Sequence, residues 1–99
     1  MRYQLIITRN ARMDLIESHQ YLNNVRNGLG LQFDKRVDEV LRRITTSPEM
    51  YAIIDDDVRA GSIKQFRHVI HYIVIDDRIE VIAVLYGSRD YSTWQERIT

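Results

Sequence analysis

The stretch FRHVIHYIVIDDRIEVIAVLY, residues 66–86, decides the fold. It contains two runs, 66–75 and 79–86, that are rich in the β-branched and aromatic residues typical of strands. Asp76 and Asp77 lie between the runs, and a short polar turn between two apolar runs indicates a β-hairpin. We therefore expect two antiparallel strands joined by a tight turn.

Both faces of this hairpin carry apolar residues. An antiparallel sheet with one solvated face should alternate between apolar and polar residues, and this one does not. Two helices can cover only one face, so we expect the other to be covered by the C-terminal tail, a second copy or a partner chain. Strict alternation assigns the apolar residues of each strand to two opposite faces. In the first strand these are Phe66, Ile70, Tyr72 and Val74 on one face and Val69, Ile73 and Ile75 on the other. In the second strand they are Ile79, Val81, Ala83 and Leu85 on one face and Ile82, Val84 and Tyr86 on the other.

The residues upstream of the hairpin predict one strand and two helices. Residues 3–7 indicate a first strand, and 8–10 supply capping oxygens for a helix that ends near Asn27 and Gly28. Pro48 marks the end of a second helix. The apolar stripes at helical spacing are Ala11, Leu15, Ser18, Leu22 and Val25 in the first helix, and Phe33, Val37, Val40, Leu41 and Ile44 in the second.

These elements together predict an α+β fold. The order is an N-terminal strand, an α-helical hairpin and then a C-terminal antiparallel β-meander. A loop over 48–57 leads to a weak strand candidate, 58–64, which Gly61 interrupts. A chain of 99 residues fits one domain, so we expect residues 1–99 to form a single unit.

The bulk composition favours a cytoplasmic protein without strong affinity for nucleic acid. Lys plus Arg equals Asp plus Glu, 14 of each, whereas domains that rely on phosphate contacts usually carry a basic excess. Cysteine is absent, which suits a reducing compartment. The N-terminal apolar run, residues 5–7, is too short for a signal peptide or a membrane span.

No metal, cofactor or ordinary active site is expected. His68 and His71 form an H-x-x-H pair, but on a strand such residues point to opposite faces and cannot chelate one ion. One histidine is expected at the edge of the core and the other on the surface. The aspartates at 55–57 read as a solvated loop, and Asp14 and Glu17 as an exposed helix face.

An arginine and aromatic set on the sheet and tail is the candidate target-binding surface. Arginine and large aromatic side chains dominate binding hot spots, and they also stack on nucleobases. A tryptophan so close to a polar C-terminus needs a place to dock, either on the sheet or on a partner. The proposed target-binding residues are Arg59, Arg67, Arg89, Trp94 and Arg97.

The chain also resembles the ParE/RelE superfamily of bacterial toxins. Ala11 with Asp14 and Leu15 resembles the start of the first helix in ParE-type toxins, and Trp94 with Arg97 resembles their W-x-x-R ending. The C-terminal half carries the most specific likeness, in Val58-Arg59, in Phe66 followed by IHYIV at 70–74, and in IEVIAVLYGSRD at 79–90.

This resemblance implies a toxin encoded beside an antitoxin, with one of two targets. ParE-like members poison DNA gyrase, whereas RelE-like members cut mRNA on the ribosome. RelE-like enzymes carry an arginine shortly before the equivalent of Tyr72, and this chain has histidines and apolar residues there unless Arg67 substitutes. We therefore expect gyrase inhibition by protein binding. If the chain is a ribonuclease, its catalytic residues would be Arg67, His71, Tyr86 and Arg89.

One residue departs from the pattern of ParE-type toxins. Many ParE-like chains have histidine where Tyr86 stands. A homologue that has lost toxicity and persists as a binding module is a third possibility. Both toxin readings imply a cognate ParD-like antitoxin, expected to lie on the helical hairpin and sheet, as part of a homo- or hetero-oligomer.

Overall fold

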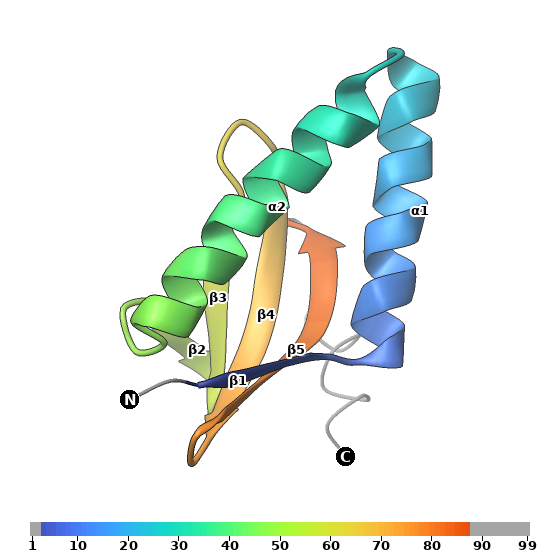
Figure 1. Cartoon of the computed structure of the whole chain (residues 1–99). Helices are drawn as coiled ribbons and strands as arrows, with labels where there is room; N and C mark the ends of the chain where they lie inside the picture. Colours follow the sequence, from blue (N-terminus) through green and yellow to red (C-terminus); the bar gives the residue numbers. More distant parts are fainter. Residues whose placement is uncertain (1–2, 88–99) are drawn as a thin grey trace.

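Residues 3–87 are described in the computed structural model shown in Figure 1. The elements follow the predicted order: β1 (Gln4–Ile7), α1 (Arg9–Val25), α2 (Leu29–Thr46), β2 (Ile53–Asp55), β3 (Val58–Ser62), β4 (His68–Ile75) and β5 (Arg78–Tyr86). The strands form one sheet in the order β1-β5-β4-β3-β2, in which β1 runs parallel to β5 and the other neighbours are antiparallel. The predicted α+β class is confirmed.

Thr8 joins the first strand to the first helix. Its backbone N–H donates to Val81 O at 3.1 Å, which continues the pairing of β1 with β5 by one residue. Its side-chain Oγ1 accepts a hydrogen bond from the Ala11 N–H at 3.2 Å, so Thr8 is also the N-cap of α1. The predicted capping segment is thus confirmed, and it fixes α1 against the edge of β5.

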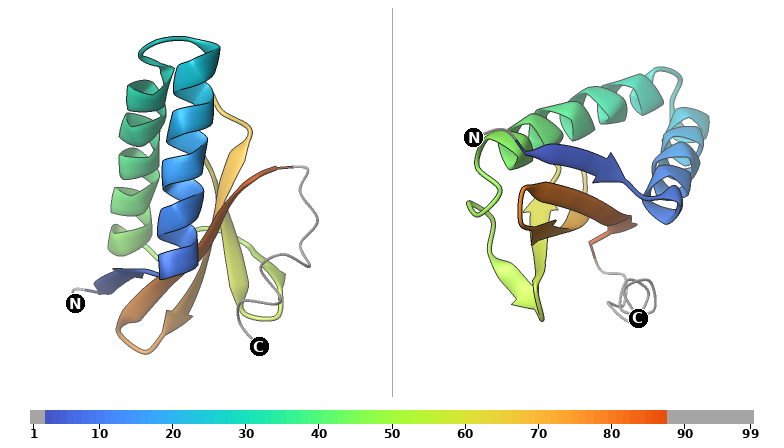
Figure 2. Two further views of the ribbon diagram at one scale, coloured as in Figure 1. Left: turned by 90° about the vertical axis from the view of Figure 1, so that its right-hand side faces the viewer. Right: turned by 60° about the horizontal axis from the view of Figure 1, so that its bottom comes forward.

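A tight turn at Gly28 folds the two helices into a hairpin that lies on one side of the sheet (Figure 2). Gly28 has φ of 90°, in the left-handed region that residues with a Cβ rarely adopt. Asn23 Oδ1 accepts a hydrogen bond from the Gly28 N–H at 2.9 Å. α2 therefore begins at Leu29, directly after the turn.

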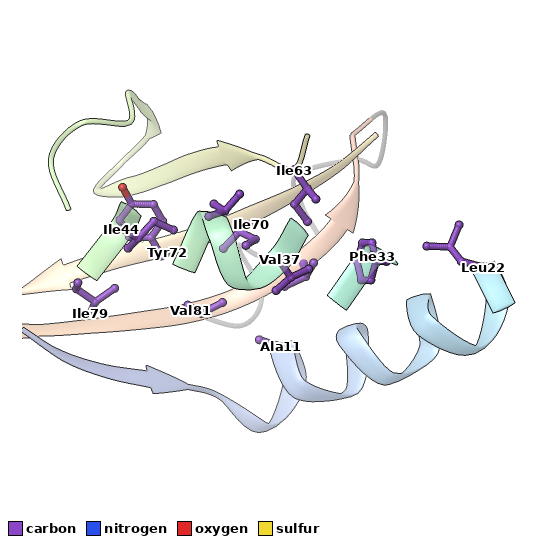
Figure 3. Packing of buried hydrophobic residues seen from close by; sticks show 12 residues of the cluster. Ala11, Leu22, Phe33, Val37, Ile44, Ile63, Ile70, Tyr72, Ile79 and Val81 are labelled. Carbon is purple, nitrogen blue, oxygen red and sulfur yellow. The ribbon is translucent and has the colours of Figure 1, made fainter. Parts of the chain in front are cut away.

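The main core lies between α2 and the sheet (Figure 3). Phe33 and Ile44 of α2 are fully buried, and Ile70 and Tyr72 of β4 meet them from the sheet. The predicted stripe of α2 is confirmed, because only Leu41 of its five residues is partly rather than fully buried. Burial of large aliphatic and aromatic side chains contributes roughly 1.5–3 kcal/mol each, so this interface is the main source of stability.

Tyr72 adds a buried polar anchor to this core. Its hydroxyl donates to Pro48 O at 2.6 Å, which ties β4 to the segment that follows α2. Burial, opposed in part by the charge of Arg59, raises the pKa of Tyr72 to about 12. The phenol is therefore neutral at physiological pH and available as a donor.

A β-bulge in β5 changes the predicted assignment of faces. His71 pairs with Ala83 and Tyr72 pairs with Val81, so Ile82 is an extra residue in β5. Ile79, Val81 and Val84 therefore pack in the main core, while Ala83 and Leu85 belong to a second cluster. Strict alternation had placed Ala83 and Leu85 with Val81, and that prediction was wrong beyond the bulge.

The second cluster consists of Val58, Ile82, Ala83 and Leu85, with Ile73 packed against it, on the face of the sheet away from the helices. The sequence predicted this second apolar face. Its expected cover, whether C-terminal tail, second copy or partner chain, falls outside the described residues and stays a prediction. The sequence also predicts a short helical turn over 93–97, and these residues lie outside the described ones.

The region between the helices and the hairpin differs from the prediction in two places. The predicted loop 48–57 contains a short edge strand, β2. Gly61 does not break β3, which runs through it. A Cβ at Gly61 would lie 3.2 Å from Val40 Cγ1, so the glycine instead lets α2 pack close to the sheet.

Ion pairs on the outer face of α2 also differ in part. The i,i+4 spacing predicts ion pairs of Asp38 with Arg42 and of Glu39 with Arg43, and the first forms at 2.9 Å. Glu39 pairs with Arg36 at 3.1 Å rather than with Arg43. Neither helix within residues 3–87 is long and apolar enough to cross a membrane.

Candidate functional site: a groove between α1 and β5

A groove runs between the first helix and the end of the last strand, where β1 no longer covers β5. Its volume is about 750 Å³, within the roughly 300–1,000 Å³ of pockets that hold drug-sized ligands. A space of this size can accept several side chains of a partner. The lining residues are Asn10, Met13, Asp14, Glu17, Ser18 and Tyr21 of α1 and His68, Val84, Leu85 and Tyr86 of the sheet.

The helix wall of the groove includes two large apolar side chains that are exposed. Met13 is 47% exposed and Tyr21 is 67% exposed, and both line the groove. Ile16, 45% exposed, and Val25, 62% exposed, extend the apolar surface of α1 outside it. Exposed apolar side chains gathered on one helix favour an interaction surface.

Asp14 connects the helix wall to the strand wall. Its Oδ2 accepts a hydrogen bond from the Val84 N–H at 2.9 Å. The carboxylate thus occupies the place on β5 that a further residue of β1 would take. The expectation of a solvent-exposed Asp14 was wrong, since this side chain is half-buried.

His68 forms the floor of the groove at the edge of the core. Only 8% of it is exposed, and its ring lies 4.9 Å from that of Phe33 and 5.5 Å from that of Tyr86. Burial lowers the pKa of His68 below its ordinary value of 6.5, so the imidazole is neutral at physiological pH. This is the core-edge histidine that the sequence predicted.

His71 lies on the other face of β4, as the strand periodicity predicted. It pairs with Ala83 of the second cluster, whereas His68 pairs with Tyr86. His71 is only 8% exposed, so the expected surface position of the second histidine was wrong. Because the two rings face opposite sides, they cannot bind one metal ion together.

The residues of the conditional ribonuclease set are only partly brought together. Arg67 and Tyr86 lie at the same end of the β4–β5 hairpin, where the Gly87 N–H donates to Arg67 O. His71 lies on the opposite face of the sheet from Tyr86, whose ring packs on His68. Arg89 lies outside the described residues.

The proposed target-binding residues fall into two groups. Arg59 is half-buried, and its guanidinium donates to Tyr51 O at 2.7 Å and to Glu49 O at 3.2 Å. That arginine holds the segment after α2. Arg67 is exposed, with no ion pair to any residue from 3 to 87. Arg89, Trp94 and Arg97 lie outside the described residues.

Sequence reasoning did not find the groove itself. The available signal was the apolar residues of α1 that fall off its buried stripe, notably Met13, Ile16 and Tyr21. A helix with one buried stripe does not need these residues for its own packing. Together with the apolar run of β5, these residues could have indicated a second, outward-facing surface on α1.

The fold of the chain matches that of a known structural class. A solved structure described as the chromosomal ParDE toxin–antitoxin system from P. aeruginosa has the same fold, with a TM-score of 0.74 over 84% of this chain and 94% of that chain. At 15% sequence identity this likeness shows the fold alone. The chain is thus a small α+β protein with the fold of a ParDE component.

The sequence then places the chain within a family. The family described as the ParE toxin of the type II toxin–antitoxin system, parDE, matches residues 5–91, which is most of the chain. The chain belongs to the ParE toxin family. No protein with a curated description matches it by sequence.

Proposed function

We propose that this toxin inhibits DNA gyrase by binding it, and that a ParD-like antitoxin neutralises the toxin by docking along α1 and in the α1–β5 groove. The chain belongs to the ParE toxin family. Its resemblance to ParE-type toxins implies DNA gyrase as the target. The action is proposed to take place in the cytoplasm. Binding rather than bond cleavage is the proposed mode.

The single observation that carries the binding mode is the separation of His71 from Tyr86. Cleavage of RNA by its 2′-hydroxyl needs a base and an acid or cation around one phosphate. His71, the candidate base, lies on the face opposite the groove, beside Ala83. A phosphate beside Tyr86 would be out of its reach. The geometry of the described residues therefore favours a toxin that acts through its surface.

The proposed antitoxin-binding surface is supported by apolar side chains of α1 that remain exposed in the folded toxin. Met13 and Tyr21 line the groove and are about half or more exposed, at 47% and 67%. A partner helix laid into such a groove would bury both side chains. Burial of this apolar surface would supply affinity at roughly 25 cal/mol per Å² before the cost of association.

The gyrase contacts are proposed at the end of the β4–β5 hairpin and in the C-terminal segment. Of the two proposed target-binding arginines within residues 3–87, Arg67 is the exposed one, and it makes no ion pair with another of these residues. Arg89, Trp94 and Arg97 follow the end of β5 in the sequence. Arg59 is a weaker candidate, since its guanidinium already binds two backbone carbonyls.

The proposal is tested with purified toxin, DNA gyrase, supercoiled plasmid and ATP. Wild-type protein should produce linear, protein-linked plasmid, and Arg67→Ala with Arg89→Ala should reduce this product about tenfold or more, as loss of hot-spot arginines does. Asp77→Ala, in the turn at the other end of β5, is the matched control and should leave the product unchanged.

Two results would contradict the proposal. Folded wild-type protein that yields no linear plasmid would remove gyrase as the target. Cleavage of mRNA in a ribosome assay by the same preparation, lost in Tyr86→Phe, would instead support the ribonuclease set of Arg67, His71, Tyr86 and Arg89.

A further inference from the structure

Among residues 3–87, the lining of the groove between α1 and β5 has an acidic wall and no lysine or arginine. Of its lining residues, Asp14 and Glu17 carry carboxylates, and none is lysine or arginine. Both carboxylates belong to α1 and lie one helical turn apart. Burial lowers the pKa of His68 in the floor, so it does not supply a positive charge at neutral pH.

Glu17 differs from the acidic residues of α2 and β5, each of which makes an ion pair. Asp34 pairs with His19, Asp38 with Arg42, Glu39 with Arg36 and Glu80 with Arg78, each at 2.9–3.1 Å. Glu17 makes no such pair with any residue from 3 to 87. Its neighbours in the wall are Met13 and Tyr21, four residues away on either side, which lie on the same face of the helix.

An occupant of the groove must therefore meet apolar surface and a negative charge side by side. When the groove is filled, water leaves the Glu17 carboxylate, and a buried unpaired charge is strongly unfavourable. A positive side chain between apolar ones would satisfy both requirements. Met13 and Tyr21 would pack on its apolar neighbours.

A second copy of this chain does not fit these requirements. Pairing of two identical grooves about a two-fold axis brings the same patch of each copy together. That arrangement would bring Asp14 and Glu17 of both copies into one interface, to which the described groove lining adds no lysine or arginine. Like charges at an interface cost free energy and select against such a pairing.

We propose that the α1–β5 groove binds a segment of the antitoxin that presents a lysine or arginine flanked by apolar side chains, and that Glu17 is the residue that selects it. The inference rests on the proposed antitoxin partner and names its chemistry. Asp14 has a separate role: its carboxylate accepts a hydrogen bond from the Val84 N–H and so holds α1 against β5. Glu17 is thus the specificity-determining charge.

The test measures the affinity of the full-length toxin for its cognate antitoxin, the product of the adjoining gene, by titration calorimetry at several salt concentrations. Glu17→Gln should weaken binding about tenfold and flatten its salt dependence, and Glu17→Arg should weaken it further, because both remove a desolvated charge pair. Asp77→Arg, with the same charge change at the distant turn, is the control and should bind as the wild type does. Replacement of one lysine or arginine of the antitoxin by glutamate should restore its binding to the Glu17→Arg toxin.

The outcomes separate this inference from the proposed function. Equal affinity of wild type and Glu17→Arg would overturn the inference alone, and the gyrase assay would be unaffected. Failure of the wild type to bind the antitoxin would overturn both the partner and the inference. A dimer of the toxin alone that tightens in Glu17→Gln would overturn the inference in favour of a second copy.

Discussion

The two helices have almost the same length but different tasks. α2 has 18 residues and buries five of them, four of which, including Phe33 and Ile44, belong to the main core. α1 has 17 residues and buries only Ala11 and Leu22. The apolar side chains that α1 does not bury, such as Tyr21, lie on its outer surface and along the groove. We therefore propose that stability depends mainly on α2 and recognition on α1, and mutation can test each part of this proposal.

The largest expected effect is the loss of a core side chain from α2. Phe33→Ala should reduce the free energy of unfolding by about 3–5 kcal/mol, because Phe33 is fully buried against Phe66 and His68 and its removal leaves a cavity. Urea denaturation measures this. Tyr21→Ala on α1 is the comparison and should change the free energy by less than about 0.5 kcal/mol. Equal losses in the two variants would contradict the division between the helices.

The next effect concerns the hydroxyl of Tyr72 beneath the end of α2. Tyr72→Phe should cost about 1–3 kcal/mol, because Pro48 O would lose its buried donor. Thermal and urea denaturation should agree on the loss. An unchanged midpoint would mean that water replaces the hydroxyl without cost.

The raised pKa of Tyr72 gives an alkaline signature at the same site. The folded state keeps the phenolic proton up to about pH 12, while the unfolded chain loses it near pH 10. Stability should therefore fall as the pH rises through this window, since the unfolded state then binds fewer protons than the folded state. The fall should be smaller in Tyr72→Phe, and an identical slope in both proteins would assign the effect to other groups.

A smaller effect is expected at the start of α1. Thr8→Ala removes the side-chain acceptor of the Ala11 N–H and should cost about 1 kcal/mol. Thr8→Ser keeps the hydroxyl and should restore most of the loss. Equilibrium denaturation of the three proteins would show whether the cap, rather than the methyl group, fixes α1 beside the groove.

The smallest effect is the dependence of stability on acidic pH at His68, which contacts Phe33 of α2 and also lines the groove. Burial lowers its pKa in the folded state, so below about pH 6.5 the unfolded chain takes up a proton that the folded chain resists. Stability from this group is present above the unfolded pKa and falls as the pH is lowered. Denaturation at pH 5 to 8 should show this fall in the wild type and a shallower one in His68→Gln. A steeper fall in the variant would contradict the assignment.

The sequence predicted most of the fold because its strong patterns are local. The stripe from Phe33 to Ile44 specifies which face of α2 is buried, and the aspartates at 76 and 77 specify the hairpin turn. β2 was not predicted, because Ile53–Asp55 is too short for alternation to be recognised. The faces of β5 beyond Ile82 were misassigned, since a bulge depends on pairing with β4.

The candidate site was predicted far less completely. Asp14 finds its partner on Val84, 70 residues along the chain, and no spacing rule shows such a contact. The groove depends on where β1 stops covering β5, which is a tertiary feature. The arginines, in contrast, could be named from residue type alone. Their predicted part in target binding remains untested for Arg67 and falls outside the described residues for Arg89 and Arg97.

The most direct test of this account measures stability and antitoxin affinity on one variant, Met13→Ala with Tyr21→Ala. Both side chains line the groove and neither is buried. The account predicts an unfolding midpoint close to that of the wild type and an affinity for the antitoxin that falls at least about tenfold, as expected when hot-spot side chains are removed. An unchanged affinity in a folded variant would contradict the claim that α1 is the recognition helix.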